Sequence, residues 1–107
     1  MSLQSVILSL LSGIPDTAVR TDIASTIYFL RDAFLSGRIS LDALKSELTS
    51  IVSTILDITH PELLPDEKKK KVSMLVDQLI KAIQMDTLRL RTLSKFSQFG
   101  RSESFPI

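Results

Sequence analysis

The residues best suited to chemistry are Asp57 and His60, close to the end of a predicted helix. They are three positions apart, so both fall on one helical face and together supply half of a metal site. An imidazole at the C-terminal end of a helix is also favoured by the helix dipole alone, which requires no metal. The chain has no cysteine, no second histidine and no glycine-rich phosphate loop. We therefore expect no catalytic residue, no metal site and no cofactor.

A run of four consecutive lysines opens the last predicted helix. Successive helical residues are about 100° apart, so these lysines form a collar around the first turn and do not share one face. The collar is either a solvated surface or a contact for phosphate or for an acidic partner surface. Charge runs are common on solvated surfaces, which favours the first interpretation. The candidate basic contacts in the collar are Lys68, Lys69, Lys70 and Lys71.

The C-terminal segment combines basic residues with aromatic ones. Such a segment can bind a membrane surface, a groove on a partner protein or nucleic acid. Three phenylalanines within ten residues, separated by polar residues, are typical of a docking peptide that inserts aromatic anchors into a partner. The predicted partner-binding residues are Leu93, Phe96, Phe99 and Phe105, and the predicted basic contacts are Arg89, Arg91 and Lys95.

Charge is divided unevenly along the chain. Residues 1–66 contain four Lys/Arg and eight Asp/Glu, a net charge of −4, whereas residues 67–107 contain nine and four, a net charge of +5. This division predicts a basic segment attached to an acidic body. The apolar content of 44% and the mean hydropathy of +0.22 indicate either a well-filled core or apolar surface left exposed for an interface.

Apolar residues at spacings of three and four predict four helices that are separated by glycine and proline. No segment is long and apolar enough to span a membrane. Expected boundaries are a Ser2 cap and a Gly13 end for the first helix, about Asp16 to Ser36 for the second, a Ser40 cap to about Thr59 for the third, and an Asp66 cap to a Gly100 end for the fourth.

These elements predict an all-α fold, a small four-helix bundle with a flexible basic C-terminal tail. We expect one helical domain over residues 1–95 and a mobile tail over residues 96–107. The short turn between the second and third helices favours antiparallel packing. The third helix has a heptad-like seam at Leu41, Leu44, Leu48, Ile51, Ile55 and Ile58. The predicted core is Leu10, Val19, Ile23, Ile27, Leu30, Phe34, Leu44, Leu48, Ile51, Ile55, Val76, Leu79 and Ile83.

The whole chain resembles the small helical accessory subunits that bind B-family replicative DNA polymerases in crenarchaeal microbes. The resemblance is carried by the size, the four helices, the Lys68–Lys71 collar, the basic tail with its phenylalanines, and the absence of asparagine and cysteine. It implies a non-catalytic subunit that binds a polymerase and tunes its activity. Depletion of asparagine and cysteine is a trend in hyperthermophile proteins, and a chain without cysteine suits a reducing cytoplasm.

Three functions remain open at this point. The first is an accessory or adaptor subunit that binds a partner protein, with a polymerase or another replication component as the suspected partner. The second is a helical bundle that binds nucleic acid through its basic C-terminal half, with an affinity that falls steeply as salt rises. The third is a structural protein that forms a homo-oligomer through the seam of the third helix. We expect a cytoplasmic protein that does not act at a membrane.

Overall fold

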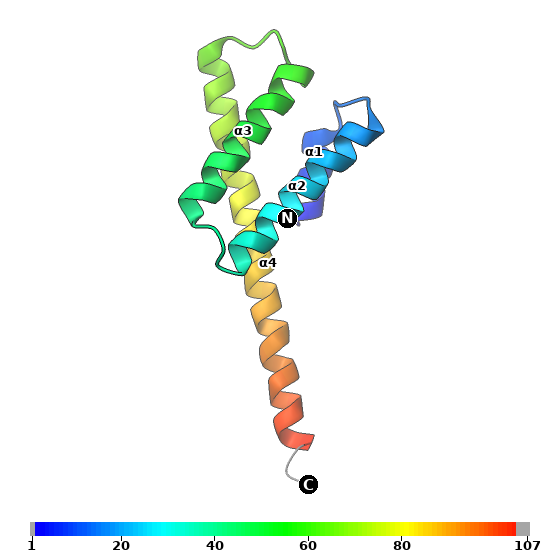
Figure 1. Cartoon of the computed structure of the whole chain (residues 1–107), viewed down its shortest axis with the longest axis vertical. Helices are drawn as coiled ribbons and strands as arrows, with labels where there is room; N and C mark the ends of the chain where they lie inside the picture. Colours follow the sequence, from blue (N-terminus) through cyan, green and yellow to red (C-terminus); the bar gives the residue numbers. More distant parts are fainter. Residues whose placement is uncertain (1, 105–107) are drawn as a thin grey trace.

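The computed structural model describes the backbone of residues 2–104 and the side chains of residues 2–85. Over the described residues it contains four helices and no strand (Figure 1). The predicted all-α four-helix class is therefore confirmed. No helix in the described part is long and apolar enough to cross a bilayer. The helices are α1 (Leu3–Leu11), α2 (Thr17–Leu35), α3 (Leu41–Thr59) and α4 (Pro65–Ser104).

Local side-chain chemistry begins the first three helices. The hydroxyls of Ser2 and Ser40 each accept a hydrogen bond from the backbone N–H three residues ahead, both at 3.1 Å. The Asp16 carboxylate accepts one from the N–H of Ala18 at 2.9 Å. Each such cap satisfies an N–H that has no partner within the helix and contributes about 1 kcal/mol. The predicted caps Ser2 and Ser40 are confirmed.

The turn between α2 and α3 depends on Gly37. Its φ of +79° lies in the left-handed region, which favours glycine because it has no Cβ. The N–H of Gly37 donates to the carbonyl of Phe34 at 3.1 Å, and that of Arg38 donates to the carbonyl of Ala33 at 2.8 Å. This pair of bonds is the Schellman pattern, which ends a helix and reverses the chain. The chain therefore returns along α2, and α3 packs against it as the short turn predicts.

The start of α4 differs from the prediction that Asp66 is its cap. The helix begins at Pro65, and the carbonyl of Leu64 accepts the first helical bond from the N–H of Lys68 at 2.9 Å. Proline suits the first helical position because it lacks an N–H and its φ is already helical. Asp66 therefore lies inside the first turn with Glu67. Negative charge there interacts favourably with the helix dipole, whereas the positive charge of the neighbouring lysines does not.

The core is formed where α1 and α3 pack against α4 and α2 packs against α3. Eight predicted core residues are buried, namely Ile27, Leu30, Leu44, Leu48, Ile55, Val76, Leu79 and Ile83. The other five are only half-buried at its edge, namely Leu10, Val19, Ile23, Phe34 and Ile51. α1 and the residue before Pro15 contribute more than predicted, with Leu3, Val6, Ile7, Leu11 and Ile14 all buried.

The buried stripe of α3 departs from the heptad-like seam that the sequence predicts. Val52 and Leu56 are 0% and 3% exposed, whereas Leu41 and Ile58, at the two ends of the predicted seam, are 44% and 48% exposed. A straight helix has 3.6 residues per turn, so it drifts by about 20° per heptad away from a 3.5-residue repeat. The centre of the predicted seam is buried within the bundle, so it is not available for self-association while the bundle is closed.

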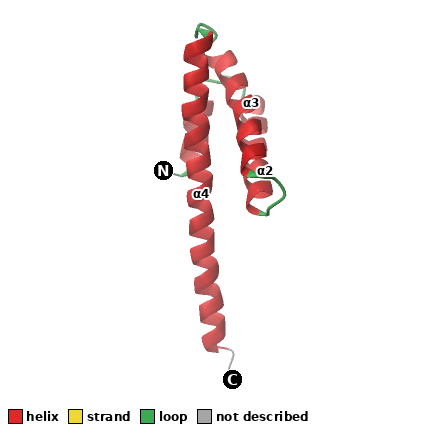
Figure 2. Ribbon diagram, turned by 90° about the vertical axis from the view of Figure 1, so that its left-hand side faces the viewer, coloured by secondary structure: helices red, strands yellow, loops and turns green. Residues whose placement is uncertain are grey.

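α4 is much longer than the other helices. It has 40 residues, against 19 in each of α2 and α3. At 1.5 Å per residue these lengths are about 60 Å and about 28 Å. Figures 1 and 2 show the ribbon of α4 continuing well past the other three helices. The radius of gyration is 17.3 Å, whereas a compact domain of this size has about 13 Å.

The predicted helix end at Gly100 is wrong, because α4 continues to Ser104. A single glycine costs a helix about 1 kcal/mol relative to alanine and does not by itself end it. The next strong helix breaker in the sequence is Pro106. The division into a domain of residues 1–95 and a mobile tail of residues 96–107 stays a prediction.

Candidate functional site

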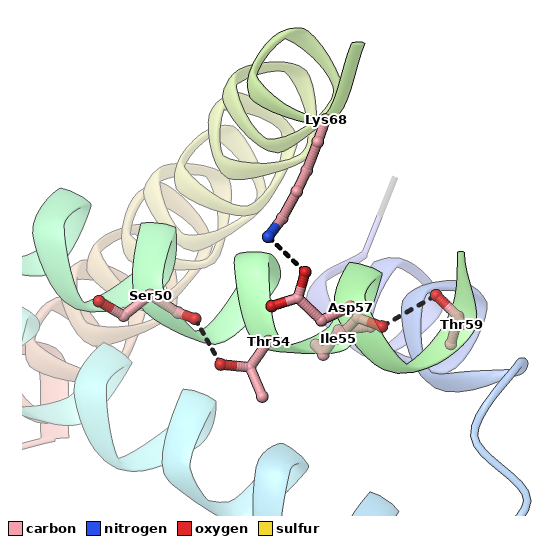
Figure 3. Close-up of polar contacts among 6 residues, drawn as sticks. All are labelled: Ser50, Thr54, Ile55, Asp57, Thr59 and Lys68. Carbon is pink, nitrogen blue, oxygen red and sulfur yellow. Dashed lines mark hydrogen bonds and ion pairs between the residues drawn. The ribbon is translucent and has the colours of Figure 1, made fainter. Parts of the chain in front are cut away.

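The first lysine of the collar joins two helices. Figure 3 shows the Lys68 ammonium, on α4, donating a hydrogen bond to the Asp57 carboxylate, on α3. The side chains are 27% and 63% exposed, so this is a surface ion pair worth about 0.2–1 kcal/mol. It ties the end of α3 to the first turn of α4. Lys68 therefore has a structural role that the sequence alone did not distinguish from the rest of the run.

The other three lysines of the collar lie in different surroundings. Lys69 is exposed and lines a groove between α3 and α4. Lys70 is exposed and lines neither of the two cavities described below. Lys71 is half-buried and lines a cavity among α1, α3 and α4. The four lysines therefore do not share one surface: Lys68 and Lys69 line the groove, whereas Lys70 and Lys71 do not, as the 100° step between helical residues leads one to expect.

The groove, called here the α3/α4 groove, has a volume of about 530 Å³. Val72 and Val76 form a buried apolar floor, at 7% and 2% exposure. Thr49 and Ser53, four positions apart on α3, are short side chains on the face of that helix that lines the groove. The lining residues are Lys45, Thr49, Ser53, Pro65, Lys68, Lys69, Val72, Ser73, Val76 and Asp77.

A second cavity of about 460 Å³ lies among α1, α3 and α4 and is more polar. Its lining includes Ser5, Ser9, His60 and Lys71, a set that contains a hydroxyl, an imidazole and an amine. Among the described residues, His60 pairs with Glu62, at 3.3 Å between Nδ1 and Oε1, and makes no hydrogen bond to either serine. The cavity therefore gathers titratable groups without the contacts that activate a nucleophile.

The two residues predicted as half of a metal site each interact with a different residue. Asp57 binds Lys68, and His60 faces Glu62. In the part of the chain whose side chains are described, no three His, Cys, Asp or Glu residues come together as metal ligands. At the end of α3, Asp57 therefore acts as the surface partner of Lys68, and His60 acts as that of Glu62.

The local structure lowers the pKa of Glu62. Its own backbone N–H, hydrogen-bonded to the carboxylate, lowers the pKa of Glu62 most. Desolvation opposes this effect, and the hydrogen bond and charge of His60 and the charge of Lys71 lower the pKa further. The carboxylate is exposed, so the lowered pKa reflects mainly this local backbone hydrogen bond and does not mark a buried catalytic group.

The remaining predicted contacts fall on the distal part of α4. Arg89, Arg91, Leu93, Lys95, Phe96 and Phe99 belong to its helical backbone, but their side chains lie outside the described ones, and Phe105 lies outside the described residues altogether. Positions 71 and 89 on one continuous helix are about 27 Å apart along its axis. The collar and the distal basic residues are therefore two separate sites, not one patch.

Sequence reasoning missed several exposed features. Phe29, on α2, is 65% exposed, and Met74 and Met85, on α4, are 50% and 56% exposed. Phe29 is out of register with the apolar stripe of α2, and that signal was available in the sequence. Lys45 was missed because its place in the lining of the α3/α4 groove depends on how α3 packs on α4.

A scan against protein-family models found no match, and searches of curated proteins and of solved structures also returned none. The resemblance to polymerase accessory subunits therefore stays a prediction. Function must be argued from the geometry of α4, the collar and the α3/α4 groove.

Proposed function

We propose that this protein is a non-catalytic accessory or adaptor subunit that binds a partner protein through residues 86–104, called here distal α4. The observation that carries the proposal is the length of α4, which is about twice that of α2 or α3. Among the described side chains, the last buried residue of α4 is Ile83. α4 continues for a further 21 residues beyond that point, from 84 to 104.

The stability of an isolated helix in water favours a partner for distal α4. In water, a helix of about 20 residues gains most of its stability from packing an amphipathic face against something else. At 100° per residue, helical positions 85, 88, 96 and 99 fall within an arc of about 80°. Positions 76, 79 and 83, which are buried in the bundle, are centred on roughly the opposite side of the helix. On one continuous helix, positions 85, 88, 96 and 99 therefore lie on a different face from the buried positions, whereas position 90 lies on the same face as the buried ones.

The specific partner we propose is a replicative DNA polymerase. The support is the resemblance in size, four-helix organisation, lysine collar and basic, phenylalanine-bearing C-terminal segment. A subunit of this kind holds or tunes an enzyme without carrying out chemistry itself.

The experiment is affinity capture from the native lysate with the full chain, followed by mass spectrometry and titration of the captured protein. The test variant combines Phe96→Ala with Phe99→Ala. An aromatic anchor at the centre of an interface costs about 2 kcal/mol or more when truncated, and such costs are not additive, so we expect the double variant to weaken binding by at least about 30-fold.

The matched control is Phe29→Ala, which removes an exposed phenylalanine from α2. It should leave the affinity for the captured protein within about twofold of the unaltered chain. Equal losses for the Phe96/Phe99 variant and for the Phe29 variant, or no loss for either, would refute binding through distal α4.

Nucleic-acid binding is a second candidate, favoured by the separation of the two basic sites along α4. Sites about 27 Å apart match widely spaced phosphates better than one compact anion. This function requires that the logarithm of the binding constant fall linearly with the logarithm of the salt concentration. Absence of a gel shift with single- and double-stranded DNA and RNA at low salt would exclude it.

A further inference from the structure

We propose that the α3/α4 groove is a second docking site and that its occupant is an acidic amphipathic helix of a partner protein. The site lies at the opposite end of α4 from distal α4 and shares no residue with it. The inference therefore goes beyond the proposed function and does not depend on it. It rests on the dimensions, the floor and the charge of the groove.

The dimensions match a helix that inserts two or three turns. The groove lining extends from Lys45 to Ser53 on α3 and from Pro65 to Asp77 on α4. At 1.5 Å per residue these stretches are about 12 Å and about 18 Å long. A helix that docks in a groove uses anchors at i, i+3 or i+4, and i+7, which span about 10.5 Å. The volume of about 530 Å³ leaves room for several aliphatic side chains.

The floor and walls favour apolar anchors over phosphates. Val72 and Val76 supply a continuous apolar floor, and Pro65 extends it at one end. The hydroxyl of Thr49 donates to the carbonyl of Lys45 at 2.7 Å, so its hydrogen-bonding need is met within α3. Small side chains on the walls allow another helix to approach closely. A nucleic-acid backbone would gain nothing from the buried valines.

Charge selects an acidic partner. Lys45 on α3 and Lys69 on α4 both line the groove, one from each helix, and both are exposed. Lys68 also lines the groove but already binds Asp57. Asp77 is the single carboxylate among the described lining residues. Both helices therefore contribute an exposed lysine to the groove lining, which fits an apolar stripe flanked by Glu or Asp.

The test measures binding of a synthetic helical peptide to the full chain by fluorescence anisotropy. The peptide has leucines at helical spacings of three and four and glutamates on both flanks, and its counterpart has lysines in place of the glutamates. We expect saturable binding of the acidic peptide and at least tenfold weaker binding of the basic one.

Two groove variants and one control locate the site. Lys45→Glu and Lys69→Glu should each weaken the acidic peptide roughly tenfold. Lys70→Glu is the matched control, because Lys70 is exposed in the same run but does not line the groove; it should change the affinity less than about threefold. Circular dichroism of each variant confirms that it remains folded.

Four results would overturn the inference. They are absence of saturable binding, equal binding of the acidic and basic peptides, equal effects of Lys69→Glu and Lys70→Glu, and binding of a short single-stranded oligonucleotide, in place of the peptide, that depends on Lys69. The variant Phe96→Ala with Phe99→Ala should bind the peptide as the unaltered chain does. A loss of peptide binding in that variant would also contradict a separate site.

Discussion

The register of α3 can be tested by two substitutions that the sequence and the structure rank in opposite ways. Leu56 lies outside the heptad-like seam but is 3% exposed, whereas Ile58 lies within the seam and is 48% exposed. Truncating a buried leucine to alanine costs about 2–5 kcal/mol, because the transfer energy and the energy of the cavity add. Truncating the half-exposed Ile58 loses about 1 kcal/mol of burial, and the better helix propensity of alanine returns a few tenths.

The assay is urea unfolding followed by far-UV circular dichroism, with thermal unfolding as a second measure. For a domain of about 100 residues, 1 kcal/mol corresponds to about 4–8 °C in Tm. Leu56→Ala should therefore lower Tm by about 10–30 °C, and Ile58→Ala by less than about 5 °C. A loss of stability for Ile58→Ala equal to or greater than that for Leu56→Ala would refute the register of α3 and with it the placement of the α3/α4 groove.

Three further outcomes follow from the described contacts. A double-mutant cycle on Lys68→Ala and Asp57→Ala should give a coupling of about 0.2–1 kcal/mol in urea unfolding, and zero coupling would contradict the ion pair. NMR titration should place the pKa of Glu62 below its ordinary value, and His60→Ala should raise that pKa. The stability that ionised Glu62 contributes is present above the unfolded pKa and is lost as pH falls through the lowered pKa. An ordinary pKa for Glu62 would contradict its hydrogen bond with His60. Ser40→Ala should cost about 1 kcal/mol in thermal unfolding through loss of the α3 cap, and an unchanged Tm would count against that cap.

Local chemistry made much of the fold predictable. The hydroxyls of Ser2 and Ser40 bond to amides three residues away, and Gly37 reverses the chain through bonds that span five residues. Such features depend on short sequence windows, so the number of helices and the three inter-helix connections could be read from the residues. The start of α4 was misplaced by the choice of Asp66 over Pro65, although both signals are local.

Features that depend on packing were less accessible. Val52 and Leu56 replace Ile51 and Ile58 on the buried side of α3 because the contact with α4 selects the face, and an ideal repeat does not. The same reasoning applies to the candidate site. Nothing in the sequence near Lys45 indicates that it lines the same groove as Lys69, 24 positions away, because that depends on how α3 packs on α4.

The most direct test of binding through distal α4 is amide hydrogen exchange of the full chain, alone and in complex with the captured partner. We predict that the partner slows exchange by at least tenfold in residues 86–104, because buried helical amides exchange only when the interface opens. Slower exchange confined to residues 2–85, with residues 86–104 unchanged in the complex, would contradict the account.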